Sequence, residues 1–147
     1  MIQNTTLRSE PSIAAGSAIA ETVVLRGEVH IGAGTVIEDN VTLGNREDGL
    51  VTIGGDSYIR AGTVICSGVM TGKGFRAGPN ASIGEEVVMG DDVFIGANAT
   101  VDGDCIIGKN VILEPNVYIA RYSHLRRGTC VGSCSMIQGS YHAHGRR

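Results

Sequence analysis

The sequence predicts an all-β fold, a parallel β-helix in which a short strand and a corner repeat every six residues. Three observations predict it. An aliphatic residue returns at every sixth position, the position four residues after it is small or β-branched, and Gly, Asn or Asp often stands three residues after it. The first two positions face inward, and the third is a turn position that favours positive φ. We expect the 147 residues to form one domain, residues 1–147.

The repeated aliphatic residue, here called the lead residue, falls into two runs separated by a shift of four residues. In 20 of the 22 repeats it is Leu, Ile, Val or Met, which chance does not explain. No segment sustains the 3.6-residue period of an amphipathic helix. The lead residues are Leu7, Ile13, Ile19, Leu25, Ile31, Ile37 and Leu43, followed by Ile53, Ile59, Ile65, Thr71, Ala77, Ile83, Met89, Ile95, Val101, Ile107, Leu113, Ile119, Leu125, Val131 and Ile137.

The turn positions three residues after the lead residues carry side chains that tolerate the left-handed region. Three of them, Asn80, Asn98 and Asn116, are 18 residues apart, so we expect an asparagine ladder whose amides bond along the stack. The predicted corner residues are Gly16, Gly34, Asn40, Asp56, Gly62, Gly68, Gly74, Asn80, Asp92, Asn98, Asp104, Asn110, Asn116 and Gly128.

Composition limits the classes of partner. Glycine occurs 22 times, tryptophan is absent, and there are two Phe and four Tyr, so a thick aromatic core is not expected. The net charge of −3 gives no general reason to expect nucleic acid or an anionic membrane. The start, MIQNTTLRSE, has no hydrophobic signal region, and no apolar run is long enough to cross a membrane. We therefore expect a cytoplasmic protein.

The cysteines and histidines do not predict a metal centre. The four cysteines lack CxxC spacing, which favours free thiols. His30, His124 and His142 are whole 18-residue turns apart once the four-residue shift is removed, so they should share one column. His124 and His142 would then be stacked neighbours, either as a pH-sensitive pair or as solvated residues. A histidine pair rarely makes a complete metal site, so no metal is predicted.

The stretch that begins at Ile53 with IGGDSYIRAGTVICSG and continues through IGEEVVMGDDVFIGANATV resembles the acetyl-CoA-dependent hexapeptide acyltransferases. It is most similar to the N-acetyltransferases of nucleotide-linked amino sugars. The resemblance implies a left-handed β-helix with triangular coils of 18 residues, about seven in this chain, each rising roughly 4.8 Å. It also implies acetyl-CoA as co-substrate, a sugar acceptor, and a homotrimer with active sites between subunits.

The chain departs from this family at positions that bear on catalysis. Family members carry a histidine after the glycine of the segment 75–78, where this chain has Pro79. They often carry an arginine before the acid that corresponds to Glu85, where this chain has Gly84. A sugar hydroxyl needs a general base, whereas a neutral amine can react once it is positioned beside a thioester. We therefore expect N-acetylation, with Glu85 and His124 as catalytic candidates and backbone N–H groups as oxyanion donors.

The four-residue shift predicts a loop protruding at residues 44–52. Glu47 and Asp48 in this loop are candidates for binding the ammonium group of an acceptor, and a solvated turn is the alternative. By resemblance, Arg60 and Arg76 are candidate contacts for an anionic substrate. Asn80 is a further candidate for substrate binding.

The C-terminal part of the chain is basic, because no Asp or Glu follows Glu114. Lys109, Arg121, Arg126 and Arg127 are therefore candidates for binding the phosphates of coenzyme A. A charged rim with a flexible tail is the alternative.

Two other function classes remain open at this stage. A non-catalytic or regulatory β-helix scaffold is favoured by Pro79. A γ-type carbonic anhydrase would need three zinc-binding histidines, partly supplied by a second subunit. Coenzyme A binding separates the transferase from the scaffold, and metal analysis separates both from the anhydrase.

Overall fold

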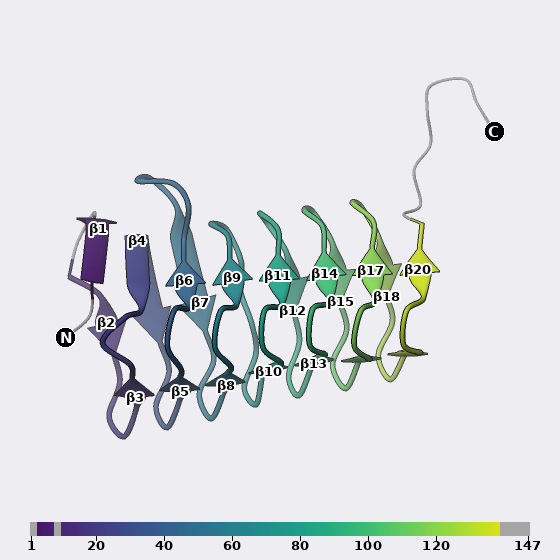
Figure 1. The fold of residues 1–147 in the computed structure, drawn as a ribbon, viewed down its shortest axis with the longest axis horizontal. Coiled ribbons are helices and arrows are strands. Elements are labelled where there is room, and N and C mark those ends of the chain that lie inside the picture. The colour runs from purple at the N-terminus through teal and green to yellow at the C-terminus, as the bar shows by residue number, and fades with distance from the viewer. Residues whose placement is uncertain (1–2, 8–9, 139–147) are drawn as a thin grey trace.

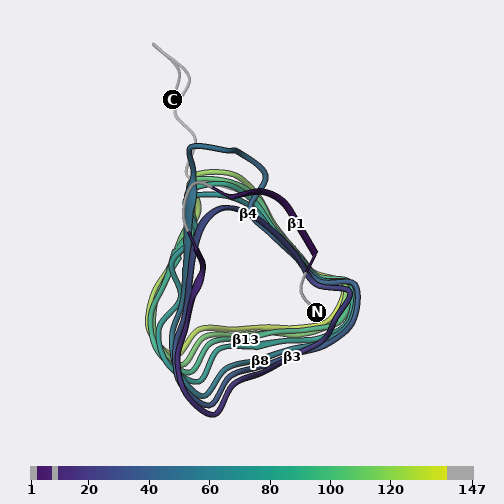
Figure 2. The ribbon, with the colours of Figure 1, turned by 90° about the vertical axis from the view of Figure 1, so that its left-hand side faces the viewer.

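The computed structural model describes residues 3–7 and 10–138. The chain forms a parallel β-helix of about seven turns, stacked side by side along the long axis of the molecule (Figure 1). Seen along this axis, the turns superimpose into a triangle (Figure 2). The predicted fold class and its triangular coils are confirmed. Among the described residues no helix is long and apolar enough to span a membrane.

Each side of the triangle is a parallel sheet, and the three sides are here called faces A, B and C. Neighbouring strands of a face are 18 residues apart in most turns, as in the pairing of Phe94 with Ile112. Face A consists of β1 (Gln3–Leu7), the start of β4 (Val24–Ile31), β6 (Thr42–Leu43), β9 (Val64–Ile65), β11 (Ser82–Ile83), β14 (Thr100–Val101), β17 (Tyr118–Ile119) and β20 (Met136–Ile137).

Faces B and C follow the same pattern. Strand β4 is long enough to turn the corner, so its second half starts the regular part of face B. Face B consists of β2 (Ser12–Ile13), the end of β4, β7 (Leu50–Ile53), a bridge at Met70, β12 (Val88–Met89), β15 (Ile106–Ile107) and β18 (His124–Leu125). Face C consists of β3 (Ala18–Ile19), β5 (Val36–Ile37), β8 (Tyr58–Ile59), β10 (Arg76–Ala77), β13 (Phe94–Ile95), β16 (Ile112–Leu113) and β19 (Cys130–Val131).

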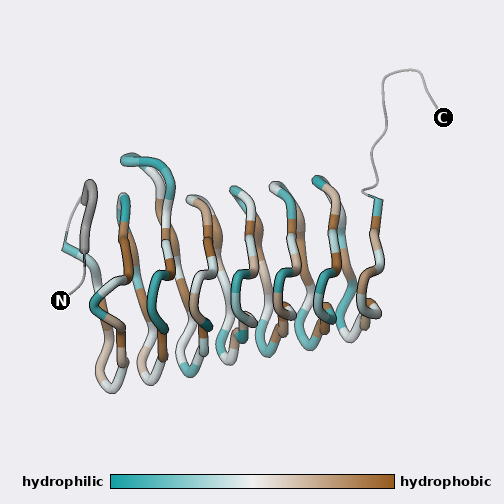
Figure 3. The backbone as a smooth tube through the Cα atoms, in the orientation of Figure 1, coloured by the Kyte–Doolittle hydropathy of each residue, from teal (hydrophilic) through white to brown (hydrophobic). Residues whose placement is uncertain are grey.

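The lead residues fill the inside of the triangle, as predicted. Ile95, Ile107 and Ile119 are at most 1% exposed, and apolar segments recur at the same place in successive turns (Figure 3). A fully buried aliphatic side chain stabilises a fold by roughly 1.5–3 kcal/mol, so a narrow but continuous stack can hold the rod together. Ile13, in the first turns, is 37% exposed because it lies near the open end of the stack.

The corners adopt the predicted left-handed conformation. All 14 predicted corner residues have positive φ, for example 59° at Asn80 and 58° at Asn98. Glu86, Tyr122 and Cys134 also have positive φ, which their residue types did not indicate. The asparagines form the expected column, but the predicted bonding between their amides is wrong: instead, the backbone N–H of Asn98 donates to the carbonyl oxygen of Pro79. Their role is conformational.

Two boundaries differ from the sequence prediction. Leu7 pairs with Gly27 instead of Leu25, because the register of β1 shifts between Asn4 and Thr6. The protruding loop is shorter than 44–52: it covers 44–49, and Leu50 already begins β7, in which Val51 is fully buried. His142 and the arginines at 146 and 147 lie outside the described residues.

Asn98 provides a test of the corner geometry. Because its φ is 58°, replacing it with valine should destabilise the protein by about 1–2 kcal/mol, since a β-branched side chain is strained in the left-handed region. Asn98→Gly, which relieves this strain, is the matched control and should stay close to the parent. Urea unfolding midpoints measure the difference. Equal midpoints for the two variants would contradict the assignment of this column as a conformational corner.

Candidate active site

The loop at residues 44–49 projects from the corner between faces A and B, outside the outline of the other turns (Figure 2). Its base is fastened to the next turn by Ser67. The Oγ atom of Ser67 accepts hydrogen bonds from the N–H groups of Asn45 and Arg46, both at 2.9 Å, and the Ser67 N–H donates to Asn45 Oδ1 at 2.7 Å. The Ser67 side chain is fully buried, so these bonds satisfy a group that would otherwise be costly to bury.

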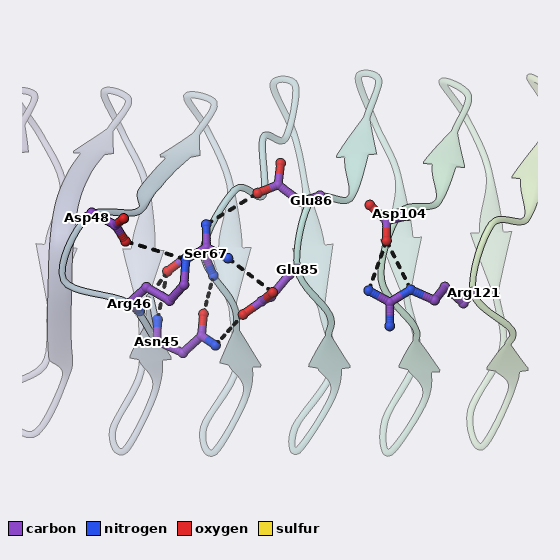
Figure 4. A network of polar contacts seen from close by, with 8 residues as sticks. All are labelled: Asn45, Arg46, Asp48, Ser67, Glu85, Glu86, Asp104 and Arg121. Atoms are coloured by element: carbon purple, nitrogen blue, oxygen red, sulfur yellow. Dashed lines mark hydrogen bonds and ion pairs between the residues drawn. The ribbon is translucent and has the colours of Figure 1, made fainter.

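Arg46 extends from this loop toward Glu85 and Glu86, which lie one turn beyond Ser67 and two turns beyond the loop (Figure 4). Its guanidinium lies 3.1 Å from Glu85, 3.4 Å from Glu86 and 3.6 Å from Asp48. The hydrogen bond with Glu86 and the charge of Glu85 raise the pKa of Arg46. Asn45 Nδ2 also donates to Glu85 at 2.7 Å. The structure thus gathers Glu85 and Asp48, predicted for catalysis and for acceptor binding, around one arginine that sequence reasoning did not identify.

A pocket of about 310 Å³ lies beside the loop, between Arg46 and face B. This loop pocket has an acidic rim, supplied by Asp48 and Glu86, and an apolar side, supplied by Leu50 and Met70. Glu47 is exposed and does not line it. The lining residues are Arg46, Asp48, Gly49, Leu50, Thr52, Gly68, Val69, Met70 and Glu86.

A stripe of apolar side chains runs along face B from the loop pocket toward the C-terminal end. Met70, Val88 and Ile106 are 48%, 45% and 52% exposed and pair in successive turns. Three apolar residues spaced 18 apart at this outward position are the sequence signal that could have identified the stripe. His124 follows Ile106 and shares the column with His30, as predicted. It lies three turns from Met70, about 14 Å, and two turns, about 10 Å, from Val88 in the turn of Glu85, so one chain does not place it beside Glu85.

Three of the four basic candidates gather at the corner between faces B and C, just beyond β18. Lys109, Arg126 and Arg127 are all exposed, and the backbone of Gly128 donates to the carbonyl oxygen of Lys109. Within residues 10–138 none of these three has an ion-pair partner. Arg121 lies at the other corner of face B, where it pairs with Asp104 at 2.9 Å (Figure 4). Its hydrogen bond with Asp104 raises its pKa.

A second pocket, of about 290 Å³, lies on face C and is here called the face C pocket. It contains the predicted contacts Arg60 and Arg76, while Asn80 adjoins it without lining it. Its lining residues are Tyr58, Arg60, Arg76, Ala77, Gly78, Pro79, Phe94, Ala97 and Pro115. The predicted site residues of one chain are therefore spread over several places: the loop corner, the B–C corner and face C, with His124 on face B and Arg121 further along the A–B corner.

Glu38 orders one end of the face C pocket. Its carboxylate accepts hydrogen bonds from the Tyr58 hydroxyl at 2.7 Å, the Ala61 N–H at 3.0 Å and Arg60 Nε at 3.3 Å. The bond from Tyr58 is the main cause of the lowered pKa of Glu38, and the same bond raises the pKa of Tyr58. Glu38 therefore stays ionised and holds both side chains in place.

The thiols of Cys66 and Cys105 are not activated. Burial raises the pKa of the Cys105 thiol, and burial likewise raises that of Cys66, so neither is an activated nucleophile. In the described part of the chain no three His, Cys, Asp or Glu side chains gather in a way that could hold a metal ion.

Comparison with solved structures finds the same fold. A histidine-to-alanine variant of GDP-perosamine N-acetyltransferase from Caulobacter crescentus, solved with CoA and GDP-perosamine, is 21% identical and superimposes with a TM-score of 0.63 over 82% of this chain. The match covers 54% of that enzyme's chain, so this chain spans about half its length. A UDP-N-acetylglucosamine acyltransferase from Francisella novicida is 15% identical, with a TM-score of 0.49 over 90% of this chain and 62% of that one.

Comparison with curated protein sequences finds no match. The family model described as "Bacterial transferase hexapeptide (six repeats)" matches residues 86–121. These residues run from the loop-facing Glu86 to Arg121, and their six-residue period continues on both sides through the described turns. This segment of the chain therefore carries the six-residue repeat that the family model describes, and the described turns around it have the β-helix fold of the solved structures.

Proposed function

We propose that the protein is an acetyl-CoA-dependent acyltransferase that acetylates the amino group of a sugar, in line with the nucleotide-linked amino sugars used by relatives. The observation that carries the proposal is the layout of face B. An acidic pocket stands at one end, an exposed apolar stripe follows, and a basic corner stands at the other end.

Coenzyme A matches this layout in chemistry and order. Its phosphates would bind Lys109, Arg126 and Arg127, whose side chains are exposed and unpaired by carboxylates in the described turns. Its extended, mostly uncharged arm would lie along Ile106 and Val88. The thioester would then reach the loop pocket near Met70. Binding of this arm would cover the apolar stripe, which is otherwise exposed to solvent.

The acceptor would bind in the loop pocket with its amine near Asp48 and Glu86. The carboxylates on this rim attract an ammonium group, and the network around Arg46 holds them in position. The neutral amine would attack the carbonyl carbon of the thioester, an amide C–N bond would form, and the C–S bond would break to release the coenzyme A thiolate, which then takes up a proton to become the thiol. Glu85, held by Asn45 and Arg46, is the proposed acceptor of the proton that the amine loses.

A homotrimer would complete the site. One chain keeps His124 away from the loop pocket, and the faces of a prism supply little concavity. Packing face B against a second copy would turn the apolar stripe into a closed cleft. His124 of one subunit could then meet the loop of another.

The acceptor half of this proposal is tested by acetyl transfer from acetyl-CoA to a panel of amino-sugar nucleotides, followed by mass spectrometry. Asp48→Asn should raise the Michaelis constant for the acceptor by about tenfold, because a charged contact contributes roughly 1.5–3 kcal/mol. Glu85→Gln should lower kcat by about 100-fold or more, as expected for loss of general-base catalysis. Glu10→Gln, at an exposed position near the N-terminal end, is the control. Absence of any acetylated product would refute the proposed reaction.

The coenzyme half is tested by calorimetric titration with coenzyme A. Replacing Lys109, Arg126 and Arg127 together by glutamine should weaken binding by at least about 100-fold, since each phosphate contact is charge-assisted. Arg26→Gln, an exposed arginine at another corner, should bind like the parent. Binding should also weaken as salt rises. No heat and no thermal shift in the parent protein would favour a non-catalytic scaffold.

A further inference from the structure

The face C pocket plays no part in the proposed acyl transfer. One of its walls is formed by Tyr58, Arg76 and Phe94, which occupy the same outward position on the consecutive strands β8, β10 and β13. The pocket is also lined by Pro79 and Pro115, which stand two turns apart at the corner after face C, with Ala97 between them. Two rigid proline rings therefore line the same pocket as aromatic rings and a guanidinium.

The groove exists because side chains are missing from its floor. The position directly after the lead residue is Glu38 and Arg60 in two turns of face C, then Gly78 and Gly96 in the next two. A Cβ atom on Gly78 would lie 2.6 Å from the backbone nitrogen of Ala97, so the stacking itself requires glycine there. The unfilled length is two turns, roughly 10 Å.

The charge in the pocket is positive. Arg76 is exposed, and in the described turns no carboxylate lies within ion-pair distance of its guanidinium. Arg60 uses its Nε atom for Glu38 at 3.3 Å, so the two groups largely balance each other. Glu38 is also the acceptor for Tyr58, which prevents the tyrosine from competing for Arg76. One unbalanced positive charge remains, at Arg76.

We propose that this pocket binds a small ligand in which a planar aromatic ring carries an anionic group, of the nucleoside monophosphate type. The ring would stack on Phe94, within the pocket that Pro79 and Pro115 also line, and the phosphate would bind Arg76. Aromatic faces attract flat rings, and a guanidinium binds phosphate through two hydrogen bonds. The volume of about 290 Å³ lies at the lower end for ligand pockets, which favours a small ligand over a large dinucleotide.

Calorimetric titration of the full chain with AMP, in the absence of acetyl-CoA, tests the proposal independently of any transferase activity. AMP should bind saturably, and Arg76→Gln should weaken binding by about tenfold or more, because a charge-assisted bond is lost. Phe94→Leu should weaken binding severalfold through loss of stacking while keeping an apolar side chain at this exposed strand position. Arg26→Gln is the matched control and should bind AMP like the parent.

Adenosine and inorganic phosphate separate the two halves of the ligand. Both should bind more weakly than AMP. If adenosine binds as tightly as AMP, the anionic half of the proposal is wrong, and if phosphate binds as tightly as AMP, the aromatic half is wrong. No saturable binding of AMP, or equal binding by the parent and Arg76→Gln, overturns the site. The urea unfolding midpoints of both variants should match the parent, since both side chains point outward.

Discussion

Backbone hydrogen bonding between successive turns is the interaction on which the rest of this structure depends. Each strand is only two residues long in most turns, too short to be stable alone, and it persists because the turns before and after it donate and accept its bonds. This pairing places residue i directly over residue i+18. Side chains are therefore arranged in columns. A residue's neighbours are set by its position in the turn, and they come mainly from the turns directly before and after its own.

The same regularity means that pockets arise only where the repeat is interrupted. The four inserted residues shift the phase after Leu43, lift the loop out of the wall and leave the loop pocket beneath it. On face C the interruption is chemical, because glycine follows Arg60 in its column and opens a groove. An uninterrupted prism would offer flat faces with little capacity to bind small molecules. Both candidate sites lie at departures from the repeat for this reason.

Much of the fold could be predicted from the sequence because the repeat encodes it locally. Ile107 is buried and Asn98 turns a corner for reasons contained within six residues, and the shared column of His30 and His124 follows from counting turns. The meeting of Arg46 with Glu85 and Glu86 could not be predicted in this way. It depends on how far the loop leans along the axis and on side-chain rotamers, neither of which has a period. The shifted register of Leu7 is a similar case, because β1 lacks a preceding turn to align it.

The separation of the candidate groups on one chain constrains any transfer reaction. Three turns of stacking lie between Met70, at the loop pocket, and His124. Columns cannot bend to bring such groups together, because that would break the hydrogen bonds that hold the turns. The stacking within one chain does not restrict a second molecule, since it can pack beside the first at a different position along the axis. If the proposed transfer uses both the acidic pocket and His124, a second copy of the chain must therefore supply one of them.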